Sequence, residues 1–344
     1  MKTLKTTTAA TLAAGIIASS PVQLTEVEKV MYHHGAYDSQ RVQFESHGVK
    51  IVGLLYTPHT ATAQYPAIVI LGPFGSVKEQ SPMEYATRLV RDGFVTLIFD
   101  PRYSGESGGE PRRLESPKAK IEDVHAALDF LQTVPQVDTN KLAALGICQG
   151  SSEMIAATAT DSRIKVLATV SGQYIYPQNI DEFFSGGGLI REQRIARGKA
   201  AKAKFEATGQ VDYTEVISLT DKNAGLPWKP IYDWYHPWTT DKWLKPSRWE
   251  NRYATMSDAE VWSFDVDNFT PKITVPTLII HGEMSDGNVA AAQHVFNELT
   301  VKDKQLVIVP GVFHTRFYDD PSVIDPAAAE VSQWFAGHLA EKFN

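Results

Sequence analysis

The sequence has a single cysteine, Cys148, among its 344 residues. One cysteine cannot form an internal disulfide, and no CxxC pair or clustered Cys/His pattern indicates a zinc site. No run of lysine or arginine could track phosphates, and the net charge of −7 argues against a nucleic-acid partner. No apolar run reaches the ~18 residues that a membrane span needs. We therefore expect no metal, no nucleic acid and no membrane span, and a small-molecule substrate is the favoured partner.

The first 25 residues fit two interpretations. They contain Lys2 and Lys5, no acidic residue before position 21, and an Ala/Leu/Ile stretch from Ala9 to Ala18. This is the pattern of a short export signal, and the threonine-rich composition also fits a disordered tail. We expect an exported protein if the segment acts as a signal, and otherwise a cytoplasmic one.

Short apolar segments alternate with amphipathic segments along most of the chain. The expected strands are an antiparallel pair at 42–58 and single strands at 66–73, 94–100, 141–148, 164–172, 276–283 and 305–311. The expected helices are at 81–93, 118–134, 288–299 and 327–343, with another directly after residue 149. This alternation predicts an α/β fold with a mostly parallel sheet that helices cover on both faces.

The alternation stops for about a hundred residues. We expect an insertion at 175–269 within a core formed by 30–174 and 270–344, and six of the seven tryptophans lie in the insertion. Rings at this density either build the insertion's own core or face a cleft. An insertion at this place would lie over the turn at Cys148, so some rings should line a pocket for an apolar or aromatic group. The candidates are Trp234, Tyr235 and Trp238.

The segment GICQGSSE, residues 146–153, places Cys148 in a small-x-nucleophile-x-small pattern. In hydrolytic enzymes this pattern turns a strand sharply into a helix, which exposes a nucleophile beside a donor for the substrate oxygen. Gly146 and Gly150 would allow the strand and helix to approach closely. The helix beginning near Gln149 would favour a thiolate at Cys148. The alternative is a buried cysteine in a tight turn.

A candidate base and acid follow Cys148 in the chain order typical of such enzymes. His314 lies just past the last expected strand and would take the thiol proton, then protonate the leaving group. Asp286 lies just past the preceding strand and would hold the imidazole in one tautomer. Glu283, nearer that strand, is a competing candidate for the acid.

An oxyanion site needs a second donor, expected from the turn at 71–80 after the third strand. Pro73 has no N–H, so we expect Phe74 to pair with the amide of Gln149. Gly75 is the fallback.

With these motifs, the chain resembles the α/β-hydrolase superfamily. The Gly-x-Cys-x-Gly turn together with DPRYSGESGGEPR after the fourth strand is similar to the dienelactone-hydrolase-related branch, among proteins with a cap insertion. The resemblance covers about residues 30–174 and 270–344. It implies an α/β-hydrolase fold with a central sheet of about eight strands, a helical cap at 175–269, a Cys-Asp-His triad, and no metal or organic cofactor.

These residues predict a cysteine-dependent hydrolase of small esters, lactones or thioesters that works through an acyl-enzyme. Two alternatives stay open: a non-catalytic small-molecule binding protein on the same scaffold, and an acyltransferase that passes the acyl group to an acceptor other than water. Nothing in the sequence indicates an oligomeric state.

Overall fold

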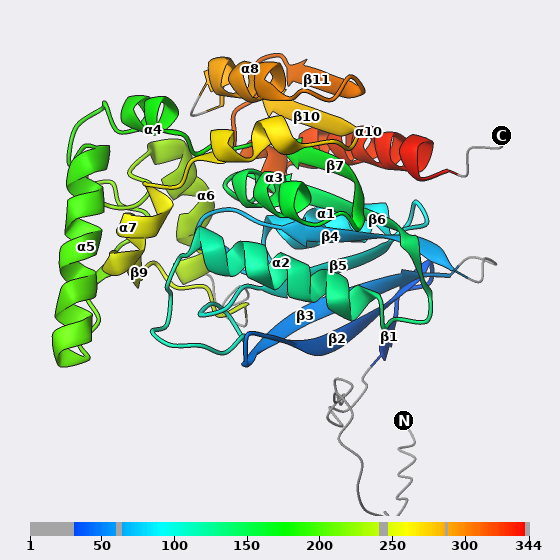
Figure 1. Ribbon diagram of the computed structural model, residues 1–344, viewed down its shortest axis with the longest axis horizontal. Coiled ribbons are helices and arrows are strands. Elements are labelled where there is room, and N and C mark those ends of the chain that lie inside the picture. Colours follow the sequence, from blue (N-terminus) through cyan, green and yellow to red (C-terminus); the bar gives the residue numbers. More distant parts are fainter. Residues whose placement is uncertain (1–30, 60–63, 241–246, 286–287, 341–344) are drawn as a thin grey trace, which may run out of the picture.

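The computed structural model describes residues 31–59, 64–240, 247–285 and 288–340 (Figure 1). The strands of its main sheet are β1 (Met31–His33), β2 (Tyr37–Ser46), β3 (Val49–Pro58), β4 (Tyr65–Leu71), β5 (Val95–Asp100), β6 (Val137–Ile147), β7 (Ile164–Val170), β10 (Thr277–Gly282) and β11 (Lys304–Val309). Eight of them coincide with the apolar segments of the sequence. The ninth, β1, is a three-residue strand that the sequence did not predict, because three residues are too few to show alternation.

The sheet runs in the order β1-β2-β3-β5-β4-β6-β7-β10-β11. The pairs β1–β2, β2–β3 and β3–β5 are antiparallel, and every pair from β5 onward is parallel. The carboxyl ends of the parallel strands therefore lie along one edge, and this edge presents the turns after β4 and β6 side by side. The sequence prediction of a mostly parallel α/β sheet is confirmed.

Helices cover both faces of the sheet (Figure 1). One face packs against α2 (Pro117–Leu131), α3 (Gly150–Thr160) and α8 (Asn288–Glu298), and the other against α1 (Ser81–Leu89), α9 (Arg316–Asp319) and α10 (Pro321–Leu339). In β4, Ile68 and Ile70 join the apolar cluster under α1 and α10, whereas Val69 joins the cluster under α2 and α3. Successive strand residues point to opposite faces, so a strand buried on both sides must be apolar throughout.

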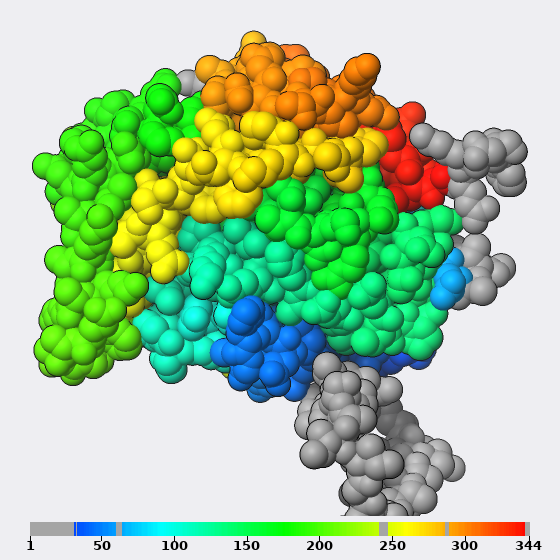
Figure 2. Space-filling model, viewed as in Figure 1, coloured from blue at the N-terminus to red at the C-terminus, as the bar shows by residue number. Residues whose placement is uncertain are grey.

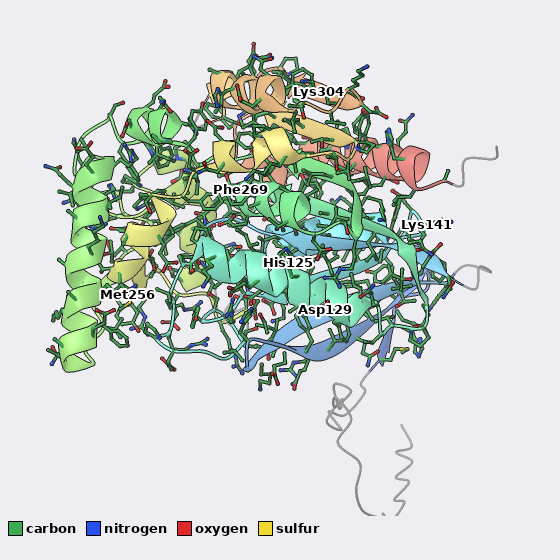
Figure 3. The ribbon with its side chains drawn as sticks, in the orientation of Figure 1. His125, Asp129, Lys141, Met256, Phe269 and Lys304 are labelled. Atoms are coloured by element: carbon green, nitrogen blue, oxygen red, sulfur yellow. The ribbon has the colours of Figure 1, made fainter. Side chains whose placement is uncertain are left out.

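The described elements between residues 177 and 261 lie beside the sheet (Figure 1). They are α4 (Pro177–Phe183), α5 (Arg191–Thr208), β8 (Tyr213–Thr214), α6 (Lys229–Thr240), β9 (Tyr253–Ala254) and α7 (Asp258–Val261), with single 3₁₀ turns at 255–257 and 266–268. Figure 2 shows α5 at the edge of the molecule, with the yellow segment that follows residue 246 between α5 and the core. Met256 of that segment, labelled in Figure 3, packs against Ala201 of α5.

Most described tryptophans of this segment are packed rather than exposed. Trp262 is 1% exposed and Trp249 is 6% exposed. Trp262 stacks on Phe74, so the segment is anchored directly onto the turn that follows β4.

Among the described residues, no helix is both long and apolar enough to cross a membrane. The first 25 residues, with their two interpretations, lie outside the described part of the chain.

Candidate active site

Cys148 lies in the turn between β6 and α3. Its φ is +56°, in the left-handed region that side-chain-bearing residues rarely adopt. A Cβ on Gly146 would come within 2.6 Å of the Gly150 carbonyl oxygen, and a Cβ on Gly150 would meet the carbonyl oxygen of Leu71. Both glycines are therefore required by the close approach of strand and helix, which is the geometry expected of a nucleophile-bearing turn.

The Cys148 sulfur is buried and surrounded by donors. Burial raises the pKa of the thiol to about 11, although hydrogen bonds from the Tyr318 hydroxyl and from the N–H groups of Gln149 and Phe74 act in the opposite direction. The thiol is therefore protonated at neutral pH, and its S–H is directed toward Gln173 Oε1 at 3.9 Å. The prediction of a resting thiolate is wrong, because the loss of hydration outweighs the nearby helix N-terminus.

His314 lies in the turn between β11 and α9, and it lines the same cavity as Cys148. The residue is 3% exposed. Burial, together with the neighbouring His281, lowers the pKa of its imidazole to about 3. The ring is neutral at physiological pH and can accept a proton. The structure thus brings together two predicted site residues that are far apart in the chain.

Of the two candidate acids, only Glu283 lies in the part of the chain that the structure describes. Asp286 lies outside the described residues. Glu283 is exposed, and its Oε2 accepts a 2.8 Å hydrogen bond from the N–H of Gly311, so this carboxylate closes the turn after β11. Within the described part of the chain, Nδ1 of His314 has no hydrogen-bond partner. Asp286 stays a prediction.

The turn after β4 presents a backbone donor to the sulfur, as expected. The N–H of Phe74 and the N–H of Gln149 both contact the Cys148 sulfur. The N–H of Gly75, the fallback candidate, instead donates to Glu115 Oε1 at 3.1 Å. On the other side of the turn, the Tyr235 hydroxyl donates a 2.9 Å hydrogen bond to the Phe74 carbonyl oxygen.

A buried ionic cluster lies beside these two turns, and no sequence pattern indicated it. Glu115 and Lys120 form an ion pair of 2.5 Å, with both side chains at most 4% exposed. At the start of α3, the Nε2 atom of Gln149 donates to Glu153 Oε1 at 2.6 Å. Burial raises the pKa of Glu153 to about 7, and the nearby Lys120 only partly offsets it. Because Glu115 also holds the Gly75 N–H, the cluster connects both turns that face Cys148.

The cavity at Cys148 is small and mostly apolar. Its volume is about 10 Å³, close to the space that one water molecule needs. The lining residues are Cys148, Gln173, Phe183, Leu226, Ile231, Tyr235, His314 and Tyr318.

Of the three predicted pocket residues, only Tyr235 lines this cavity. Trp234 and Trp238 instead border a surface groove of about 450 Å³ between α6 and α9. The Trp234 ring meets the ring of Tyr318 edge-on, with centroids 4.8 Å apart. Tyr318 lines the cavity and Trp234 lines the groove, so the rings of these two residues lie between the cavity and the groove.

The sequence also missed Gln173 and Tyr318 as site residues. Tyr318 had a usable signal, because it follows His314 by four residues in the segment HTRFY and its ring lies 5.4 Å from the imidazole. Gln173 directly follows the turn after β7, and its N–H donates to the Cys148 carbonyl oxygen at 2.9 Å.

Comparisons of the sequence and the fold with known proteins find similarity to hydrolases. Residues 47–315 match the family model described as X-Pro dipeptidyl-peptidase (S15 family). The chain is 30% identical over 315 residues to the uncharacterized protein PA2218 of Pseudomonas aeruginosa, which is 87% of this chain and 81% of that protein. The crystal structure of PA2218 superposes with a TM-score of 0.78 at 28% identity, covering 93% of this chain and all of that chain.

Two further proteins are similar to parts or to the fold of this chain. The crystal structure of the α/β hydrolase GrgF from Penicillium has a TM-score of 0.73 at 19% identity, covering 88% of this chain and 99% of that chain. The thiohydrolase aneE of Aspergillus aculeatus is 33% identical over 123 residues, which is 36% of this chain and 38% of that protein. The architecture is the α/β-hydrolase fold.

Proposed function

Because the chain belongs to the X-Pro dipeptidyl-peptidase (S15) family and has the α/β-hydrolase fold, it is a hydrolase, and we propose that Cys148 is its nucleophile. The observation that supports this most directly is the surroundings of the sulfur. Three donors face it, from Tyr318, Gln149 and Phe74, and a neutral histidine shares its cavity. A cysteine that serves only packing needs neither the donors nor the strained backbone.

In the proposed reaction, the Cys148 sulfur attacks the carbonyl carbon of an ester or thioester while its proton passes to His314. The carbonyl oxygen becomes negatively charged and accepts hydrogen bonds from the N–H groups of Phe74 and Gln149. The bond to the leaving alcohol or thiol then breaks, and His314 gives that group its proton. Water then attacks the carbonyl carbon of the acyl-enzyme and gives a proton to His314. The carbon–sulfur bond breaks, and His314 returns that proton to the sulfur, which releases the acid and restores the thiol.

Asp286 completes this proposal as the acid that orients His314. It follows β10 in the chain, and the other candidate, Glu283, is engaged by the Gly311 N–H. A buried imidazole gains a proton in the reaction, and a carboxylate beside it would stabilise that charge.

We propose that residues 175–269 act as a cap that shapes the substrate pocket. Four of the residues that line the cavity come from this segment, namely Phe183, Leu226, Ile231 and Tyr235. They are apolar or aromatic and leave little free volume. A substrate therefore has to be small at its acyl end, or has to displace these side chains as it enters.

The cavity favours an ester or thioester over a peptide with a free amino terminus. Among its described lining residues there is no carboxylate that could pair with an ammonium group. The similarity to a thiohydrolase over 123 residues supports thioesters as one substrate class.

The experiment that tests the proposal compares three substrates: a short aryl ester, its thioester counterpart and an X-Pro anilide. We expect a burst of aryl alcohol equal to the enzyme concentration, an acyl adduct on Cys148 by mass spectrometry, and little cleavage of the anilide. Cys148→Ala should abolish turnover. Ser151→Ala is the matched control, because this serine lies in the first turn of α3, three residues after Cys148, and donates to the Gly146 carbonyl oxygen.

Two results would contradict the proposal. Turnover by Cys148→Ala at the parent rate would remove the cysteine from the chemistry, and loss of turnover only in Ser151→Ala would point to a serine enzyme. Saturable binding of the esters with no turnover at all would instead favour the alternative of a binding protein.

A further inference from the structure

Three side chains with metal-binding atoms meet at the β1 edge of the sheet, away from Cys148. His33 Nδ1 lies 2.6 Å from Asp38 Oδ1, and His59 Nε2 lies 2.7 Å from the same oxygen. All three ligand atoms lie within 4.8 Å of one another. The side chains are accessible, with exposed fractions of 72% for His33, 35% for His59 and 19% for Asp38.

The backbone fixes the positions of these residues. His33 on β1 lies directly opposite Asp38 on β2 in the antiparallel ladder. His59 directly follows β3, whose last residue, Pro58, pairs with Tyr37. A 3.0 Å hydrogen bond from the His59 N–H to the Ala36 carbonyl oxygen holds this end of β3 against the β1–β2 turn. The cluster therefore draws one side chain from each of three neighbouring strands or their ends.

The hydrogen bonds of His59 turn its Nε2 atom toward the carboxylate of Asp38. His59 Nδ1 lies 2.8 Å from the Gly35 carbonyl oxygen, which can only accept, so Nδ1 must hold a proton. In the neutral ring, Nε2 then has a lone pair, and this lone pair faces a carboxylate oxygen of Asp38 at 2.7 Å. Nε2 is therefore the ring nitrogen that can bind a cation shared with Asp38, either a proton or a metal ion.

From this geometry we propose that His33, Asp38 and His59 form a binding site for a divalent transition-metal ion of the zinc class. Two imidazoles and one carboxylate are a ligand set that Zn²⁺ accepts, with water completing the coordination. Metal-bound histidines commonly donate their other ring N–H to a backbone carbonyl, which is the contact between His59 and Gly35. Zn²⁺ with bonds of about 2.0–2.1 Å sets its ligand atoms roughly 3.3 Å apart, so small rotations of exposed side chains would form the site.

The site would act as a clamp on the sheet edge and not in the hydrolytic reaction. β3 runs antiparallel to β5, with Val52 opposite Asp100, so His59 lies at the opposite end of the sheet from the turns that face Cys148. An ion held by residues from β1, β2 and the end of β3 would tie a three-residue edge strand to the rest of the fold. The sequence hid this set, because its members are separated by five and 21 residues.

The test uses the full chain without an affinity tag, stripped of metal with a chelator and titrated with Zn²⁺ by calorimetry at pH 7.5. Co²⁺, whose visible absorption reports imidazole coordination, provides a second probe. We expect one equivalent of Zn²⁺ to bind and the melting temperature to rise with Zn²⁺ concentration. Asp38→Asn and His59→Ala should each weaken Zn²⁺ binding at least tenfold.

His34→Ala is the matched control, because this histidine adjoins the cluster but contacts the Ser39 hydroxyl instead, at 2.8 Å. It should bind Zn²⁺ as the parent does. Aryl-ester hydrolysis should be equal in the parent, His59→Ala and His34→Ala, which separates this inference from the proposed function. Circular dichroism of the metal-free variants confirms that they fold.

The proposal is wrong if Zn²⁺ produces no saturable heat, or if Asp38→Asn and His59→Ala bind it with the parent affinity. Either result would show that the cluster is a hydrogen-bonded set of side chains alone.

Discussion

The hydrogen bond between Tyr235 and the turn after β4 allows a sharp test of the oxyanion proposal. The Tyr235 hydroxyl donates to the Phe74 carbonyl oxygen at 2.9 Å, and Tyr235 is 1% exposed. Tyr235→Phe removes this donor and keeps the ring that lines the cavity and stacks on Trp249. Water has little access to replace the hydroxyl, so the buried carbonyl loses its partner. The perturbation therefore acts on the turn and leaves the shape of the pocket unchanged.

The size of the effect on stability and on kcat can be worked out from two general values. A buried acceptor left without a partner costs about 1–3 kcal/mol of unfolding free energy. Complete loss of one oxyanion donor lowers kcat by about 10²–10³. Tyr235→Phe displaces the Phe74 N–H without deleting it, so we expect kcat to fall by roughly 10–100-fold, with KM for an aryl ester within about twofold of the parent.

The assay measures kcat and KM by stopped-flow release of the aryl alcohol, and unfolding free energy by urea titration. Tyr232→Phe is the control, because this residue lies on the same helix and stacks on His236 away from the turn. A loss of stability without a loss of kcat would show that Phe74 is not an oxyanion donor. Parent-like values of both quantities would show that the hydrogen bond does not position the turn at all.

Three further predictions follow from the same region. The rate at which iodoacetamide alkylates Cys148, followed by mass spectrometry, should rise about tenfold per pH unit between pH 7 and 10, because the thiol pKa is about 11. A rate that no longer rises with pH above about pH 7 would instead reveal a preformed thiolate. Burial raises the folded-state pKa of Glu153 to about 7 from 4.5, so between these pH values the folded protein keeps a proton that the unfolded protein loses, and the parent becomes less stable as the pH rises. The unfolding free energy of Glu153→Gln, measured by urea titration, should therefore increase by about 3 kcal/mol relative to that of the parent between pH 4.5 and 7.5. A difference that does not change with pH would refute the reasoning. Gly150→Ala should lower the unfolding free energy by at least ~2 kcal/mol, because its Cβ would meet the Leu71 carbonyl oxygen. Gly337→Ala on α10 places no atom within 4 Å of the new Cβ and should raise the unfolding free energy by up to about 1 kcal/mol. Equal urea midpoints for the two variants would contradict this.

The sequence predicted those parts of the site that depend on local geometry and chain order. Gly146 and Gly150 flank Cys148 because a tight strand-to-helix turn excludes a Cβ at both positions. A five-residue sequence motif is enough to reveal this requirement. His314 could be found because the ends of parallel strands meet at one edge of the sheet. The same reasoning identified eight strands, since buried parallel strands are continuous apolar segments.

What the sequence did not predict depends on burial, which only the folded chain defines. The thiolate prediction considered the helix N-terminus beside Cys148 and could not include the dehydration that raises the pKa of the thiol. Lys120 lies in an amphipathic helix, where a lysine is usually expected on the solvent-exposed face. In the structure it is 3% exposed and forms an ion pair with Glu115. Trp234 and Trp238 were expected in the pocket, and they line the outer groove because Tyr318 occupies the space between.

The protonation states of the resting site have a consequence for how the proposed enzyme selects its substrate. Burial keeps Cys148 as a thiol and His314 as a neutral imidazole, so neither group is charged before a substrate arrives. Negative charge is favourable in this buried cavity where donors are directed at it, as the N–H groups of Phe74 and Gln149 are in the proposed reaction. A carbonyl group that places its oxygen there lets the charge move from sulfur to oxygen while the proton moves to His314. An electrophile without such an oxygen meets only an unreactive thiol. Reactivity is thus conditional on fit, which also protects the sulfur from oxidants that react with free thiolates.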